Sequence, residues 1–147
     1  MERLQLRQYK RDYPRRYALV ARCLEAIKRA DAQFPEAACP ITSRLLCEVL
    51  PHCTLMCGYY HSAGKTRRHF WVFDMRARVH LDVTQAQFPG GQKGVVVYGT
   101  DERMEQYTLA DVETFNEAMR ISYFAKPMAE IKVGATSLAQ IARDVLR

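Results

Sequence analysis

The sequence predicts an α+β fold with N-terminal helices, an antiparallel β-sheet of about four strands and C-terminal helices. Three observations support this prediction. The first part of the chain has apolar residues at helical spacing, the middle alternates apolar and polar residues, and the end returns to helical spacing. Helices and strands in separate runs are typical of α+β folds. No repeat or linker divides the 147 residues, so we expect a single domain over residues 1–147.

Two helices are expected before the strands. From Pro14 to about Gln33 an apolar stripe recurs every three or four residues, and a proline is tolerated in a first helical turn. A second helix is expected to begin at Cys39 or Pro40 and to end before Pro51. The segment between the two helices is interpreted as a loop.

Four segments are expected to form strands because β-branched and aromatic residues alternate with polar ones. They are residues 54–60, 69–74, 78–84 and 95–98. The glycine-rich residues 89–94 lie between the last two. They lack both a following helix and a Gly-Lys-Ser/Thr sequence, which argues against a phosphate loop and favours a turn or a mobile flap.

Two helices are expected after the strands. Thr108 followed three residues later by Asp111 resembles a helix start, and this helix would carry Phe115 and end near Phe124. The last helix is expected to begin around residues 136–137.

The composition restricts the compartment and the partners. No apolar run is long enough to span a bilayer, and the N-terminus lacks the apolar block of a secretory signal. We therefore expect a cytoplasmic protein, or one delivered to another cell without a signal peptide, and no membrane partner. The net charge of +6 is compatible with an acidic partner. A nucleic-acid partner is not favoured, because no nucleic-acid-binding motif accompanies the charge.

The cysteines do not predict a disulfide framework or a metal site. Their number, five, is odd and their spacing is irregular. Zinc binding by Cys53 and Cys57 with His52 or His61 is an alternative, but no second Cys or His pair follows at the spacing of a structural zinc site. We expect no metal and no cofactor, and we interpret both cysteines as buried thiols.

The segments 69–74 and 78–84 are predicted to form a β-hairpin. If Phe73 pairs with Arg78, His69 lies directly opposite Asp82. Residues opposed in this way have Cβ atoms roughly 4.5–5.5 Å apart, close enough for an imidazole–carboxylate hydrogen bond. Asp82 stands between apolar strand residues, where a charge needs a partner. We assign His69 as that partner, with His80 on the same face as an alternative.

Cys39 differs from the other cysteines in its position at a helix start. Unpaired N–H groups and partial positive charge at such a position favour a thiolate. Cys23 and Cys47 lie on apolar helix faces and are interpreted as buried thiols, an interpretation that also remains open for Cys39. A thiolate nucleophile, an imidazole base and an orienting carboxylate suffice for nucleophilic catalysis. We therefore predict a catalytic triad of Cys39, His69 and Asp82.

An acyl-transfer site also needs a donor for the developing oxyanion. Gln33, six residues before Cys39, is the first candidate, and Gln85 and Gln87 compete with it. Each glutamine is also compatible with a plain surface position. Trp71 shares a strand face with the predicted base and is expected to shield it. We assign Gln33, Trp71 and Gln87 to oxyanion or substrate binding.

These motifs resemble the papain-like and transglutaminase-like cysteine enzymes. The resemblance rests on the spacing Gln33-x5-Cys39, on His69-Phe70-Trp71-Val72 and on Asp82-x-Thr84-x-x-Gln87-Phe88. It is closest to small bacterial and phage members of the superfamily and covers about residues 33–88. It implies a papain-like/transglutaminase-like core with Cys39 as nucleophile, His69 as base and Asp82 as the orienting residue. The orienting residue of papain itself is an Asn.

The sequence leads to two hypotheses on function. The first is a cysteine hydrolase or acyl transferase that acts on an amide bond of a peptide, an isopeptide or a glutamine side chain. A protein or peptide is then the expected substrate. The alternative is a catalytically inactive binding module that contacts an acidic protein or nucleic acid through its basic surface.

Overall fold

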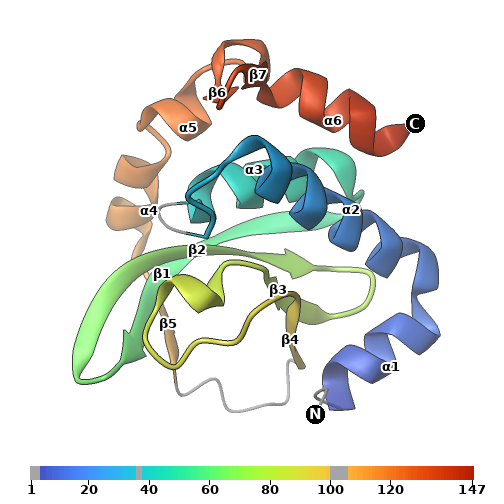
Figure 1. The fold of residues 1–147 in the computed structure, drawn as a ribbon. Helices are drawn as coiled ribbons and strands as arrows, with labels where there is room; N and C mark the ends of the chain where they lie inside the picture. Colours follow the sequence, from blue (N-terminus) through green and yellow to red (C-terminus); the bar gives the residue numbers. More distant parts are fainter. Residues whose placement is uncertain (1–3, 36–37, 100–105) are drawn as a thin grey trace.

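A five-stranded antiparallel sheet with the order β4-β3-β2-β1-β5 forms the centre of the structure (Figure 1). The computed structural model describes residues 4–35, 38–99 and 106–147. The sheet strands are β1 Cys53–Ser62, β2 Lys65–Asp74, β3 Val79–Asp82, β4 Val96–Gly99 and β5 Tyr107–Leu109. The helices are α1 Leu4–Asp12, α2 Pro14–Ala30, α3 Cys39–Val49, α4 Val112–Ala118, α5 Ser122–Ala125 and α6 Leu138–Leu146, with 3₁₀ turns η1 Gln85–Gln87 and η2 Met128–Glu130. A small hairpin pairs β6 Lys132–Val133 with β7 Thr136–Ser137.

The β1–β2 hairpin is the longest ladder of the sheet. It runs from the pair Cys53–Asp74 to the pair Ser62–Lys65. Ala63 and Gly64 connect the strands with φ angles of 50° and 71°, and this two-residue turn matches the twist of the strands. The ladder fixes which residues of β2 point to each face. Phe70 and Val72 face the helices, whereas His69 and Trp71 face the other side.

The helix α3 packs on one face of the sheet, and α2 and α6 pack against α3 on that side (Figure 1). Their apolar stripes meet Val72 and Leu81 of the sheet in the main hydrophobic core. Ile27 of α2, Leu45 of α3 and Leu138 of α6 are fully buried in it. Removing such a side chain from water contributes roughly 1.5–3 kcal/mol. This core holds the start of α3 against β2.

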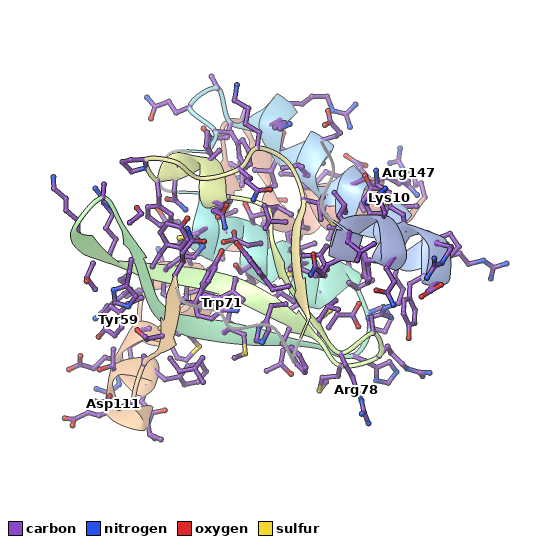
Figure 2. The ribbon with its side chains drawn as sticks, turned by 90° about the horizontal axis from the view of Figure 1, so that it is seen from below. Lys10, Tyr59, Trp71, Arg78, Asp111 and Arg147 are labelled. Carbon is purple, nitrogen blue, oxygen red and sulfur yellow. The ribbon has the colours of Figure 1, made fainter. Side chains whose placement is uncertain are left out.

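The opposite face of the sheet carries an aromatic cluster, the second core of the molecule. It consists of Tyr60, Trp71, Phe88, Val96, Tyr98 and Tyr107. Seen from below, Trp71 lies near the centre of the sheet and Arg78 at its rim (Figure 2). The predicted flap belongs to this face. A Cβ atom on Gly91 would lie 1.8 Å from the carbonyl oxygen of Gln85, so the glycine permits a tightly packed turn here.

Several predicted elements need correction. The helix α1 was not predicted, because Tyr9 is its only buried residue. The fifth strand, β5, occupies residues that were expected to begin a helix. The cap of α4 is Asp111, which accepts a hydrogen bond from the N–H of Thr114 at 2.7 Å, rather than Thr108. The long helix predicted up to Phe124 is divided into α4 and α5.

No helix among the described residues is both long and apolar enough to cross a membrane.

Candidate active site

His69 and Asp82 form a buried pair. Nε2 of His69 lies 2.7 Å from Oδ2 of Asp82, and the side chains are 0% and 2% exposed. The predicted register was nevertheless wrong, because Phe73 pairs with His80 instead of Arg78. The strands are joined by a four-residue turn, residues 75–78. Since the register differs by two residues, Asp82 keeps its face of the sheet and meets His69 diagonally.

The carboxylate of Asp82 is held by further donors. Its Oδ2 also accepts a hydrogen bond from the hydroxyl of Tyr107 at 2.6 Å. Its Oδ1 accepts bonds from the N–H of Thr84 at 3.0 Å and from the Thr84 hydroxyl at 3.3 Å. A buried carboxylate with this many donors is stable as an anion and keeps a fixed orientation.

Gln85 connects this pair to the rest of the aromatic face. Its side-chain N–H₂ donates to the hydroxyls of Tyr107 at 2.9 Å and Tyr98 at 2.8 Å. Its side-chain oxygen accepts from the N–H of Gln92 at 2.8 Å. Gln85, which sequence reasoning placed among the oxyanion candidates, therefore supports Tyr107 and the glycine-rich turn from a buried position.

Cys39 begins α3 and faces His69. Its thiol is among the groups that raise the pKa of His69, both through its charge and through a side-chain interaction with the ring. The side chain is 7% exposed and packs with Cys57, Phe70 and Ala118 on the helical side of the sheet. The second ring nitrogen of His69, Nδ1, is buried and has no hydrogen-bond partner among the described residues. Nδ1 is thus the ring nitrogen that remains unpaired in the part of the chain that the structure describes.

The electrostatics favour a charged imidazole. Burial lowers the pKa of His69, but the charge and hydrogen bond of Asp82, with the contribution of Cys39, raise it to about 9. Burial also raises the pKa of Asp82, yet His69, Tyr107 and Thr84 hold it below its ordinary value. Burial and Asp82 raise the pKa of Tyr107, so its hydroxyl remains a donor. The arrangement supports an imidazolium at neutral pH.

Aromatic rings enclose the His69 imidazole. Trp71 is stacked at 5.9 Å with an interplanar angle of 24°, as expected for a residue that shields the base. Phe88 meets the ring edge-on at 4.8 Å, and Tyr60 does so at 5.9 Å. His80, the alternative base, instead accepts a hydrogen bond from the indole N–H of Trp71 at 3.0 Å. His80 therefore orients Trp71.

The structure does not bring Gln33 to the triad. Gln33 lies exposed in the turn after α2, where its backbone N–H donates to Oδ1 of Asp31 at 2.9 Å. No contact joins its side chain to Cys39 or His69 in the described part of the chain. Gln87 lies in the segment Asp82-x-Thr84-x-x-Gln87-Phe88. Its side-chain nitrogen is buried and has no partner in the described residues. The oxyanion role of either glutamine stays a prediction.

The other four cysteines have different surroundings. Burial raises the pKa of Cys23 and Cys53 to about 12, that of Cys47 to about 11, and also that of Cys57. The thiol of Cys53 lies 3.8 Å from an Nη atom of Arg16. Within residues 4–35, 38–99 and 106–147, no group of three or more His, Cys, Asp or Glu side chains is placed to hold a metal ion.

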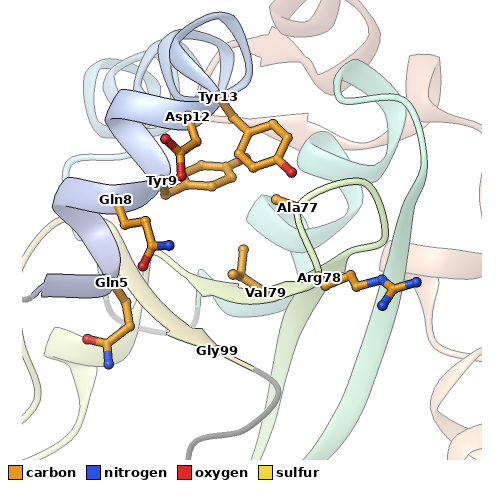
Figure 3. A pocket seen from close by; sticks show the side chains of 9 residues that line it. All are labelled: Gln5, Gln8, Tyr9, Asp12, Tyr13, Ala77, Arg78, Val79 and Gly99. Atoms are coloured by element: carbon orange, nitrogen blue, oxygen red, sulfur yellow. The ribbon is translucent and has the colours of Figure 1, made fainter.

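Several surface depressions lie outside the predicted triad, and two of them adjoin elements described above. Figure 3 shows a pocket of about 420 Å³ between α1 and the strands β3 and β4, lined by residues such as Tyr9, Asp12 and Arg78. An apolar groove of about 320 Å³ lies between β1 and α4. Cys57 and Phe115 line this groove and belong to the cluster that packs around Cys39.

Sequence reasoning missed Tyr107 and the role of Thr84. The Thr84 contact had a local signal, because an aspartate commonly accepts a hydrogen bond from the backbone two residues later. Tyr107 had none, since its position depends on the pairing of β5 with Tyr60 of β1.

No protein-family model, curated protein or solved structure matches the chain.

Proposed function

We propose that this protein is a cysteine hydrolase or acyl transferase that acts on an amide bond, with a papain-like/transglutaminase-like core. The observation that carries the proposal is the buried His69 ring. One ring nitrogen is bound to Asp82, and the other has no partner in the described chain and is available to Cys39. This arrangement matches the needs of an activated thiol nucleophile.

The chemistry proceeds in two steps. The Cys39 thiolate attacks the carbonyl carbon of the amide, and the protonated His69 gives its proton to the leaving amine as the C–N bond breaks. A thioester on Cys39 remains. His69 then takes a proton from water, whose oxygen attacks the thioester and releases a carboxylic acid and the Cys39 thiolate, so that the thiolate–imidazolium pair is restored. An amine in place of water gives acyl transfer. Asp82 holds the imidazole in the required orientation.

The start of α3 supplies the surroundings of the reacting carbonyl. The first backbone N–H groups of a helix have no partners within the helix and carry partial positive charge. Pro40 has no N–H, so the N–H of Cys39 itself is the nearest donor for the oxyanion.

An acyl-transfer probe tests this proposal. Mixing the protein with p-nitrophenyl acetate is expected to release about one equivalent of p-nitrophenolate in a burst, because the acyl-enzyme accumulates. Mass spectrometry should place the acetyl group on Cys39. Cys39→Ala should abolish the burst and His69→Gln should slow it.

Two matched variants control for indirect effects. Cys57→Ala removes a buried thiol from the same cluster, and His80→Gln removes a histidine from the same sheet face. Both should retain the burst. Acetylation spread over several cysteines, or unchanged in His69→Gln, would contradict the proposal and favour the inactive binding module.

A further inference from the structure

Two buried donors near the predicted triad have no partner among the described residues. They are one terminal guanidinium nitrogen of Arg67, Nη1, and the side-chain nitrogen of Gln87. A buried N–H without an acceptor costs about 1–3 kcal/mol, and more when the group is charged. Such donors are therefore candidates for contact with a ligand. The hydroxyl of Tyr60 also has no described partner. The charges of Tyr98 and Asp82 raise its pKa, which indicates that it points toward the interior.

Both donors adjoin Phe88, and the ring of Phe88 also contacts His69, the proposed catalytic base. The guanidinium carbon of Arg67 lies 5.9 Å from the centre of this ring, and Gln87 directly precedes it in the chain. The same ring meets the His69 imidazole edge-on at 4.8 Å. Arg67 also precedes His69 by two residues on β2, so both side chains leave the same face of the sheet.

The charge of Arg67 has no acidic partner in the described chain. Arg16, by contrast, is paired with the buried Asp74. Arg68 is exposed and points to the opposite face of β2. A half-buried guanidinium with a free N–H is well suited to a carboxylate, which it binds through charge-assisted hydrogen bonds.

We propose that Arg67, with Gln87 as a second donor, binds a carboxylate of the substrate next to the scissile amide. This inference rests on the proposed function. The substrate class is thus an amide that carries a carboxylate close to its carbonyl. The carboxylate is either the C-terminus of a peptide or the side chain of an acidic residue.

Two alkylating reagents of similar size test the proposal. The rate constant for alkylation of Cys39 is measured with iodoacetate, which carries a carboxylate, and with neutral iodoacetamide. The iodoacetate/iodoacetamide ratio should exceed that of the urea-unfolded chain. It should fall about fivefold or more in Arg67→Gln, because a charged hydrogen bond is lost. It should stay within about twofold in Lys65→Gln, which removes an exposed, screened charge from the same face of β2.

The outcomes separate the two proposals. If Cys39 reacts selectively with iodoacetamide but the ratio is unchanged in Arg67→Gln, or falls equally in Lys65→Gln, the carboxylate site is wrong and the nucleophile stands. If Cys39 shows no selective reaction, the proposed function itself fails.

A second measurement on the unmodified protein does not depend on how the variants fold. N-acetylalanine and the α-amide of N-acetylglutamic acid are tested for protection of Cys39 against iodoacetamide. Protection by the first identifies a C-terminal carboxylate, and protection by the second a side-chain carboxylate. Equal protection by neutral N-acetylalaninamide would overturn the proposal.

Discussion

At the scale of single residues, the properties of His69 depend on one carboxylate. Asp82 is buried, ionised and within 2.7 Å of the imidazole, and its charge raises the pKa of His69 against the effect of burial. Without that charge, burial alone would favour the neutral ring. Asp82 thus affects both the orientation and the protonation of the base.

Replacing Asp82 by Asn should lower the pKa of His69 from about 9, because the largest contribution that opposes burial is lost. An NMR titration of the ring nitrogens measures this directly. Asp144→Asn changes an exposed carboxylate on α6 and should leave the titration as it is. A His69 pKa that stays near 9 in Asp82→Asn would refute this account.

Tyr107→Phe should destabilise the protein by about 1.5–3 kcal/mol, because a hydrogen bond to a buried charge is lost. The hydroxyl lies 2.6 Å from Asp82 and also accepts a bond from Gln85. Urea unfolding gives the free energy. Tyr123→Phe, at a partly exposed site on α5, should change it by less than about 0.5 kcal/mol. Equal effects of both changes would argue against a special role of Tyr107.

At the scale of elements, a buried ion pair joins α2 to the end of β2. Asp74 is fully buried and accepts hydrogen bonds from Arg16 at 2.8 and 2.9 Å and from the hydroxyl of Tyr9 at 2.7 Å. The pair fixes the N-terminal helices against the strand that carries His69.

Arg16→Met should therefore destabilise the fold by about 3–5 kcal/mol, because it leaves the Asp74 charge buried without its partner. Arg11→Met removes an arginine whose pair with Asp12 is exposed, at 72% and 43%, and should change stability by less than about 1 kcal/mol. Thermal unfolding of the two variants makes the comparison. Similar melting temperatures would show that the pair contributes little.

The elements also show how far sequence reasoning reaches. The strands β1 to β4 were predicted because alternation is a local signal. The pairing of His69 with Asp82 was predicted from a register that is wrong by two residues, and it is present because a shift of two leaves Asp82 on the same face. The strand β5 was not predicted, because the spacing of Thr108 and Asp111 resembles a helix start. Only the pairing with β1 makes these residues a strand. The unpaired donor of Arg67 likewise depends on distant packing around Phe88.

At the scale of the whole molecule, His69 links stability to pH. Its pKa of about 9 in the folded state exceeds the value of 6.5 expected when the chain is unfolded. The folded state therefore binds this proton more tightly, and the contribution is complete below pH 6.5 and lost as the pH rises toward 9. The cysteines with raised pKa values, for example Cys47 at about 11, act in the same direction, but only from about pH 8 upward, where thiols of the unfolded chain begin to ionise.

The free energy of unfolding should accordingly fall between pH 6.5 and 9, a window set by the two pKa values of His69. Urea denaturation at a series of pH values measures the slope. The His69→Gln variant should be nearly flat between pH 6.5 and about 8, below the range in which thiols of the unfolded chain ionise, while His80→Gln should keep the slope. A wild-type curve as flat as that of His69→Gln would rule out the raised pKa.

Cys39 and His69 pack in two different clusters of side chains. Cys39 is embedded with Cys57, Phe70 and Ala118 beneath the helices, whereas His69 is embedded among the rings of Tyr60, Phe88 and Trp71 on the other side of the sheet. The distance between the Cys39 sulfur and the His69 imidazole therefore depends on the packing of both clusters. Substitutions that displace either cluster are therefore expected to change the reactivity of the thiol even when Cys39, His69 and Asp82 are unchanged.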